Sequence, residues 1–189
     1  MALSAAFGFA ACNNNTNDKA TTNDSTKTQV GSQTASTSNA TLSSTGPLND
    51  VLSAYLQIKN ALTNDNANEA ANGGNAFVAA IGKLDNSSMT AEQKKVFDET
   101  AADAKEMAEH IGKSADKIAH QREHFEMLSN DVYDMVKAFK TNKPLYKDFC
   151  PMYNNGKGAN WISETKDIKN PYLGKEMPEC GEVKEEIKQ

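Results

Sequence analysis

Apolar residues recur at helical spacing in four consecutive segments between residues 48 and 141. In the first segment, residues 48–62, an apolar side chain returns every three or four positions, with one polar interruption at Lys59. The last segment, from residue 118 onward, is the most strongly amphipathic, and Pro144 follows it. This spacing gathers the apolar side chains on one face of an α-helix, and that face must be buried against a partner. The pattern therefore favours a helical domain.

The pattern predicts helices over residues 48–63, 67–84, 91–112 and 114–141. Thr90 and Gln93 have the spacing of a capping box, which starts the third helix at Ala91, and Ser114 is expected to cap the fourth. Gly73-Gly74 either weakens the second helix, by about 1 kcal/mol per glycine relative to alanine, or marks a close helix contact. Short connections between four such helices predict an all-α fold, an antiparallel up-and-down four-helix bundle.

Helical periodicity ends after Pro144, and Gly, Pro, Asn and aromatic residues become frequent. Turn signals such as Asn154-Asn155-Gly156 and Asn170-Pro171 interrupt this region. We expect an irregular C-terminal segment packed on the bundle, with a short extended piece at Trp161-Ile162. Residues 48–189 are therefore predicted to be one helical domain that ends in a tail containing Cys and Met.

The first residues are small and apolar, and Cys12 follows them. They resemble the end of a bacterial lipoprotein signal, although no Lys or Arg precedes the apolar run. On this interpretation residues 1–12 are a signal remnant, and Cys12 carries a lipid that anchors the protein to a membrane. The alternative is an ordinary disordered terminus. Residues 13–47 contain no aromatic residue and are rich in Asn, Thr and Ser, so we expect a disordered tether.

The formal net charge of −5 argues against a nucleic-acid-binding protein, which would carry a basic stripe. The chain contains no run of 18 apolar residues, so the sequence predicts no membrane-spanning helix. With the lipoprotein-like start, these features predict a protein anchored to a bacterial membrane. It would face the periplasm or lie on the outer surface.

Sulfur-containing residues stand at both ends of the tail, as Cys150-x-Met152 and Met177-x-x-Cys180. Thiolate and thioether groups form a soft ligand set, which prefers Cu(I) to Mg, Ca or Mn. If the two ends meet, up to four sulfurs surround one metal site. A disulfide between Cys150 and Cys180 is the competing interpretation, since exported proteins commonly form such bridges. Free buried thiols are a third.

Two histidines and a methionine recur at i, i+4 and i+7 on the fourth predicted helix, as His120, His124 and Met127. This spacing puts them on one stripe beside the apolar face. Two imidazoles and a thioether can hold a copper or zinc ion. The alternative is that all three are ordinary boundary residues. His110 lies on another helix, and the sequence gives it no role.

Several absent motifs argue against an enzyme. No Glu-x-x-His precedes any of the three histidines, which disfavours a carboxylate-bridged di-metal bundle. The chain has no His-Glu-x-x-His, no Gly-x-Ser-x-Gly and no phosphate-binding loop. Its many carboxylates follow a helix as a solvated charged face does.

A set of short motifs lies between the fourth predicted helix and the end of the tail. The motifs are Gln121-Arg122-Glu123-His124-Phe125, Leu128-Ser129, Cys150-Pro151-Met152, Gly158-Ala159-Asn160-Trp161, Asn170-Pro171-Tyr172-Leu173-Gly174, Met177 and Cys180-Gly181. With these motifs, about residues 48–187 resemble a domain of unknown function from bacterial lipoproteins, and a similar domain is appended to periplasmic adaptors of heavy-metal efflux pumps. The resemblance implies an exported helical domain linked to the handling of copper or related heavy metals. The positions it carries over to a metal are Cys150, Met152, Met177, Cys180 and His124.

We therefore expect a lipid-anchored protein that binds a soft metal, Cu(I) before others, and buffers it or transfers it in the cell envelope. An efflux-pump adaptor or a copper-donor protein is the expected partner. The alternative, from a different class, is a structural or interaction module without metal, held by a Cys150–Cys180 disulfide and docked on an efflux or envelope partner.

Overall fold

The computed structural model describes residues 48–188 of the chain. The predicted lipidation at Cys12, the signal remnant and the tether at residues 13–47 lie outside the described residues. Within residues 48–188, no helix has both the length and the apolar character needed to cross a membrane.

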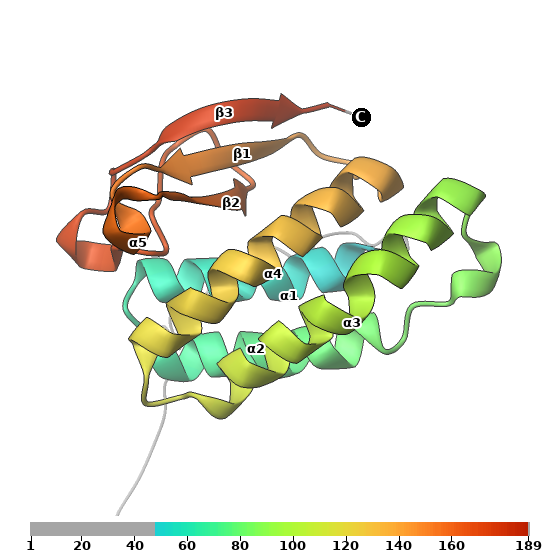
Figure 1. Ribbon diagram of the computed structural model, residues 1–189, viewed down its shortest axis with the longest axis horizontal. Helices are drawn as coiled ribbons and strands as arrows, with labels where there is room; N and C mark the ends of the chain where they lie inside the picture. The colour runs from blue at the N-terminus through green and yellow to red at the C-terminus, as the bar shows by residue number, and fades with distance from the viewer. Residues whose placement is uncertain (1–47, 189) are drawn as a thin grey trace, which may run out of the picture. The chain divides into compact units, whose positions relative to one another are not determined.

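Four long helices make up most of the described chain (Figure 1). Consecutive helices pack on one another: α1 contacts α2, α2 contacts α3, and α3 contacts α4. Their apolar faces share one core with side chains from the C-terminal region. The helices are α1 (Asn49–Thr63), α2 (Ala67–Ile81), α3 (Ala91–Lys113) and α4 (Ile118–Phe139). A short 3-10 helix, η1 (Asn86–Ser88), precedes α3.

The predicted starts of the first three helices are confirmed to within one residue, and the ends of α2 and α4 fall short of the prediction. Thr90 and Gln93 form the full capping box, because each side chain accepts a hydrogen bond from the other residue's backbone N–H. The predicted cap at Ser114 is wrong. Ser114 ends α3, and α4 begins after Lys117 without a side-chain cap.

The close contact considered for Gly73-Gly74 is present. A Cβ atom on Gly74 would lie 2.7 Å from the carbonyl oxygen of Ala108 and 2.8 Å from the backbone nitrogen of Gly112. A Cβ atom on Gly73 would lie 2.8 Å from a side-chain carbon of Ile58. The two glycines thus allow α2 to approach α3 on one side and α1 on the other, which offsets their low helix propensity.

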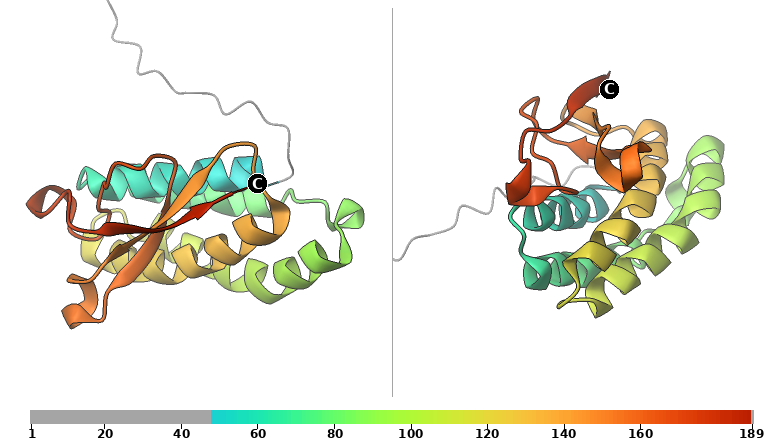
Figure 2. Two further views of the ribbon diagram at one scale, coloured as in Figure 1. Left: turned by 90° about the horizontal axis from the view of Figure 1, so that it is seen from above. Right: turned by 60° about the vertical axis from the view of Figure 1, so that its left-hand side comes forward.

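The C-terminal segment is a correction to the sequence prediction, because it forms an antiparallel sheet and the fold is not all-α. The strand order is β2-β1-β3, so the first strand along the chain is central. Figure 2 shows the strands crossing above the helices. The strands are β1 (Leu145–Cys150), β2 (Ala159–Ser163) and β3 (Glu182–Ile187), with a short turn α5 (Tyr153–Gly156) and a 3-10 helix η2 (Gly174–Glu176) between them. The extended piece predicted at Trp161-Ile162 is part of β2.

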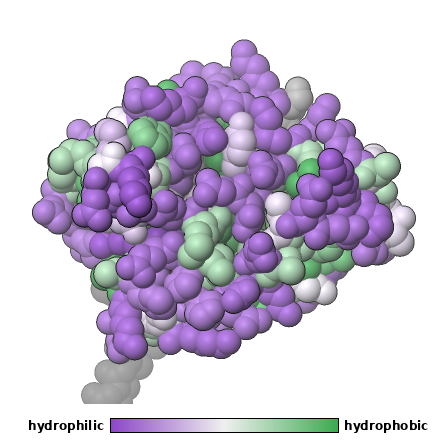
Figure 3. Space-filling view, in the orientation of Figure 1, coloured by the Kyte–Doolittle hydropathy of each residue, from purple (hydrophilic) through white to green (hydrophobic). Residues whose placement is uncertain are grey.

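The sheet is held to the helices through β2, which packs on α4 and α1. The hydroxyl of Tyr55 on α1 accepts a hydrogen bond from the backbone N–H of Ile162, at 2.9 Å, and lies 2.8 Å from the hydroxyl of Ser129 on α4. Both Tyr55 and Trp161 are fully buried. The surface in view is mostly hydrophilic, with scattered apolar patches (Figure 3).

Candidate metal centre

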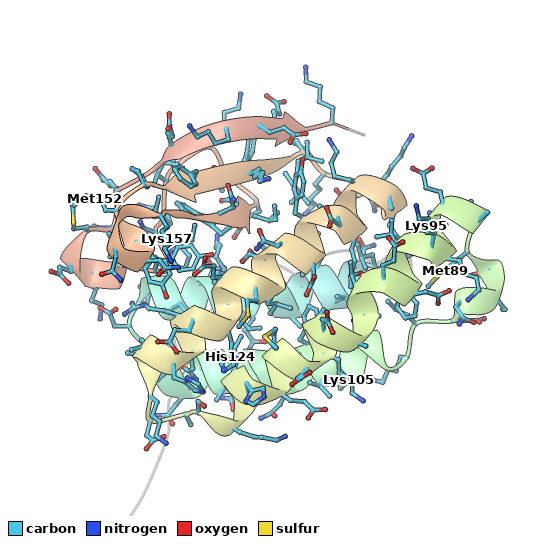
Figure 4. All side chains as sticks on the ribbon, in the orientation of Figure 1. Met89, Lys95, Lys105, His124, Met152 and Lys157 are labelled. Carbon is cyan, nitrogen blue, oxygen red and sulfur yellow. The ribbon has the colours of Figure 1, made fainter. Side chains whose placement is uncertain are left out.

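Three histidines come together where α3 and α4 lie side by side. His120 and His124 are one turn apart on α4, as the sequence predicts. The third, His110, comes from the last turns of α3. His110 had no predicted role, because the register between two packed helices depends on their contact and not on either helix alone. Their potential ligand atoms all lie within 4.8 Å of one another. Figure 4 shows His124 on α4 at the side that faces α3.

The two α4 imidazoles face each other through their Nε2 atoms, which lie 3.0 Å apart. The remaining nitrogen of each ring has a partner of its own. Nδ1 of His120 lies 3.2 Å from a carboxylate oxygen of Glu123, and Nδ1 of His124 lies 3.3 Å from the sulfur of Met107 on α3. Both rings are therefore held at their Nδ1 edges, and their Nε2 atoms point into the same space.

The environment favours the neutral, metal-binding form of His124. Partial burial lowers its pKa, and the neighbouring His120 and His110 lower the pKa further when they are charged. Glu123 and Glu106 act in the opposite direction, but the net pKa of His124 is below its ordinary value. Only a neutral imidazole offers a lone pair to a metal ion.

The facing Nε2 atoms have a separation suited to a metal ion. At a Zn–N or similar bond length of about 2.0–2.1 Å, two donors of a tetrahedral site lie about 3.3 Å apart. The observed 3.0 Å is within a small ring rotation of that value. His120 and His124 can therefore hold an ion with little rearrangement.

His110 is placed differently. Its ring stacks on that of His124, with centroids 4.5 Å apart and planes 13° from parallel. The lone pairs of an imidazole lie in the ring plane, so stacked rings do not direct them at a common point. His110 must turn to complete a three-histidine site, and its side chain is 46% exposed, which leaves it room to do so.

The methionine of the predicted stripe is not the one that touches the rings. Met127 is 45% exposed, whereas the partly buried Met107 contacts His124 from the neighbouring helix. Met107 precedes His110 by three residues, so the pair Met107-x-x-His110 shares one face of α3. That spacing was the one signal in the sequence that pointed to a second half of the cluster.

The two tail thiols also meet. Cys150 ends β1 and Cys180 lies just before β3, and because these strands pair, the Sγ atoms come within 3.6 Å of each other. Both are free thiols; Cys150 is buried and Cys180 is half-buried. Burial raises the pKa of the Cys180 thiol, and contact with Cys150 raises it further. At a metal–sulfur bond length of about 2.3 Å, two tetrahedral donors lie about 3.8 Å apart, so this pair fits bidentate ligation as well as oxidation to a disulfide.

The tail methionines do not share the burial of these thiols. Met152, two residues after Cys150, is 57% exposed, and Met177 is 36% exposed. Figure 4 shows Met152 at the periphery of the molecule near α5. The two thiols meet at the edge of the core, whereas the two thioethers are exposed.

Comparison with known families gives one match, over the helical part of the chain. Residues 51–144 match a protein family of unknown function, DUF3347. The DUF3347 match begins in the first turn of α1 and ends immediately before β1, so it contains all three histidines and Met107. The sheet and both tail cysteines lie beyond it. No curated protein and no solved structure matches the chain.

Proposed function

We propose that the protein is an exported, lipid-anchored metal-binding protein that holds a soft transition metal ion, Cu(I) before others, for buffering or transfer in the cell envelope. The observation that carries this proposal is the 3.0 Å separation of the Nε2 atoms of His120 and His124, with His110 beside them. Imidazole nitrogen suits copper and zinc among the common metal ions. The sulfur atoms of Cys150 and Cys180 favour copper in its monovalent form.

The architecture supports this role as a rigid platform. We propose that α1–α4 act as an antiparallel up-and-down four-helix bundle, with the metal centre at the outer seam between α3 and α4. A site on facing helices is held more precisely than a site on loops. The resemblance of the motifs to bacterial lipoproteins and efflux-pump adaptors suggests that the ion is exchanged with an adaptor or a copper-donor protein. In this proposal Cys12 is the point of lipid attachment.

The role is binding and not catalysis. Around the histidines the nearby carboxylates are exposed partners of the rings: Glu123 contacts His120, and Glu106 lies 3.8 Å from Nε2 of His110. Neither is set apart in a desolvated pocket, as a general acid or base would be. An ion held here would be exchanged through the exposed edge of the seam.

The direct test is a metal titration of the full chain, reduced and without oxygen, with Cu(I) in competition with a chromophoric chelator and, separately, with Zn(II). We expect stoichiometric binding that weakens at least tenfold in His120→Ala and in His124→Ala. The double variant Cys150→Ser, Cys180→Ser leaves the histidines intact, and its affinity shows how much the tail thiols contribute to metal binding. The proposal is wrong if the wild-type chain takes up no metal, or if the histidine variants bind as tightly as wild type.

A second candidate is the structural or interaction module without metal, which the 3.6 Å contact between the two thiols favours. A disulfide there would tie the end of β1 to the start of β3, and the stapled domain would dock on an envelope partner. Thiol titration of protein purified without reductant from the exported, native location discriminates between the two. Two reactive thiols at Cys150 and Cys180 support ligation, and none supports the staple.

A further inference from the structure

In each of the two facing imidazoles, Nδ1 contacts a group that can only accept a hydrogen bond. The thioether sulfur of Met107 lies 3.3 Å from Nδ1 of His124, and a carboxylate oxygen of Glu123 lies 3.2 Å from Nδ1 of His120. Neither a thioether nor an ionised carboxylate can donate a proton. Each contact is therefore favourable only when the nitrogen that faces it carries the hydrogen.

This requirement fixes the tautomer of His124. In a neutral imidazole one nitrogen carries the proton and the other a lone pair, and the hydrogen bond made by one nitrogen decides which is which. With hydrogen on Nδ1 of His124, the lone pair of that ring lies on Nε2, which is within hydrogen-bond distance of Nε2 of His120, at 3.0 Å. In the metal-free protein a hydrogen on Nε2 of His120 can bridge the two rings, and a metal ion takes the place of that hydrogen.

We propose that Met107 is a positioning residue of the metal centre, and that it lies outside the coordination sphere. It accepts the Nδ1–H of His124 and so presents Nε2 of that ring to the ion, while Glu123 does the same for His120. This inference rests on the proposed metal-binding function and deepens it, since it assigns Nε2 coordination to both rings. Glu123 is 66% exposed and contributes less than the partly buried Met107.

Met107 cannot share one ion with the facing Nε2 pair in this arrangement. Its sulfur lies at the Nδ1 edge of His124, and the two nitrogens of an imidazole direct their in-plane bonds away from each other. An ion seated between the Nε2 atoms is therefore on the other side of the ring from the sulfur. The contacts that orient metal-binding histidines in this way commonly change affinity when they are lost.

The experiment compares Met107→Leu with Met127→Leu in the full chain. Both changes replace a thioether by a hydrocarbon of similar size. Met107 contacts the ring of His124, whereas Met127, on the stripe of His120 and His124, is 45% exposed. We expect Zn(II) affinity to fall about tenfold in Met107→Leu and to stay within twofold of wild type in Met127→Leu. Equal affinities for the two variants would refute a positioning role.

Two spectroscopic readouts separate positioning from ligation and from a general loss of packing. Nitrogen NMR of the metal-free protein at pH 8 should show the His124 proton on Nδ1 in wild type and in Met127→Leu, and a shift towards Nε2 in Met107→Leu. X-ray absorption of the Cu(I)-loaded Cys150→Ser, Cys180→Ser chain should show nitrogen donors without sulfur. A proton on Nε2 of His124 in the wild type, or a sulfur donor that disappears in Met107→Leu, overturns the inference. A wild-type chain that binds no metal refutes the proposed function instead, and the metal-free NMR result still decides the tautomer.

Discussion

The ammonium group of Lys59 on α1 lies 2.6 Å from a carboxylate oxygen of Glu164, directly after β2. The lysine side chain is only 2% exposed, whereas that of the glutamate is 37% exposed. Burial acts to raise the pKa of Glu164, but the charge of Lys59 and its hydrogen bond hold the net pKa below the ordinary value. The polar interruption in the first apolar stripe is thus a charge that joins a helix to the sheet.

Removing the carboxylate should cost more than removing the lysine. Glu164→Gln leaves the buried ammonium without the carboxylate that it contacts, and we expect a loss of about 1–3 kcal/mol in the free energy of unfolding. Lys59→Met replaces the same ammonium by apolar volume and should cost less. Because the pKa of Glu164 is lowered, its contribution is present above its ordinary pKa and is lost as the pH falls through the folded value. Urea denaturation at pH 7 measures the difference, and equal losses in the two variants would contradict this account.

Asp148 should make the protein less stable as the pH rises towards neutrality. Both of its carboxylate oxygens are buried without a hydrogen-bond partner. Burial raises its pKa from 3.8 to about 7, Glu164 also raises it, and Lys59 partly opposes this. A raised carboxyl pKa means that folding takes up a proton between these two values, so stability declines across that window. Asp148→Asn should reduce the pH dependence of stability and raise the free energy of unfolding by on the order of 2 kcal/mol relative to wild type at pH 8.

The measurement is the free energy of unfolding of the wild type and of Asp148→Asn, each at pH 5 and at pH 8. If both chains lose the same stability over that interval, the carboxyl of Asp148 is not the group responsible.

Gly74→Ala should loosen the contact between α2 and α3. The added methyl group would meet backbone atoms of α3 at 2.7 and 2.8 Å, and backbone cannot move aside as a side chain can. We expect a loss of about 1–3 kcal/mol by overpacking, despite the better helix propensity of alanine. Gly82→Ala is the matched control, because its methyl group would come no closer than 3.3 Å to any neighbour. Thermal unfolding of both variants is the measurement, and a stabilised Gly74→Ala chain would show the prediction to be wrong.

A mild thiol oxidant should join Cys150 to Cys180 within one chain. The sulfurs lie 3.6 Å apart and 30 residues separate the two cysteines in sequence. Closing a loop of that length is expected to stabilise the fold by about 3–4 kcal/mol in the chain-entropy model. Peptide mapping identifies the bond, and chemical denaturation before and after oxidation measures its effect. Cys150→Ser is the control, and cross-linked dimers in the wild type would speak against an intramolecular pair.

The helices could be predicted from the sequence because their signals are local. Apolar spacing sets the faces of α1 and α4, and Thr90 with Gln93 fixes the start of α3 within one turn of chain. The sheet could not be predicted, since its pattern is not local. β1 alternates imperfectly because the charged residue Asp148 is one of its buried positions, and β3 is mostly exposed and charged, so neither has the alternation typical of a half-buried strand.

In the candidate metal centre, likewise, the local part of the pattern could be predicted and the contacts between elements could not. The helical repeat placed His120 and His124 on one stripe, but it could not say which residues of α3 lie opposite. His110 and Met107 become part of the cluster only through the packing of two helices. The meeting of Cys150 with Cys180 depends likewise on the pairing of β1 with β3, which joins residues far apart in sequence.

The central strand of the sheet receives its second partner, β3, from beyond the β1–β2 hairpin. Pairing β3 with β1 closes a longer loop than pairing β2 with β1 does, and it is the contact that brings Cys150 and Cys180 together. The three histidines lie on α3 and α4 and do not depend on that contact. Local opening of β3 would therefore separate the sulfur pair and leave the histidine cluster assembled.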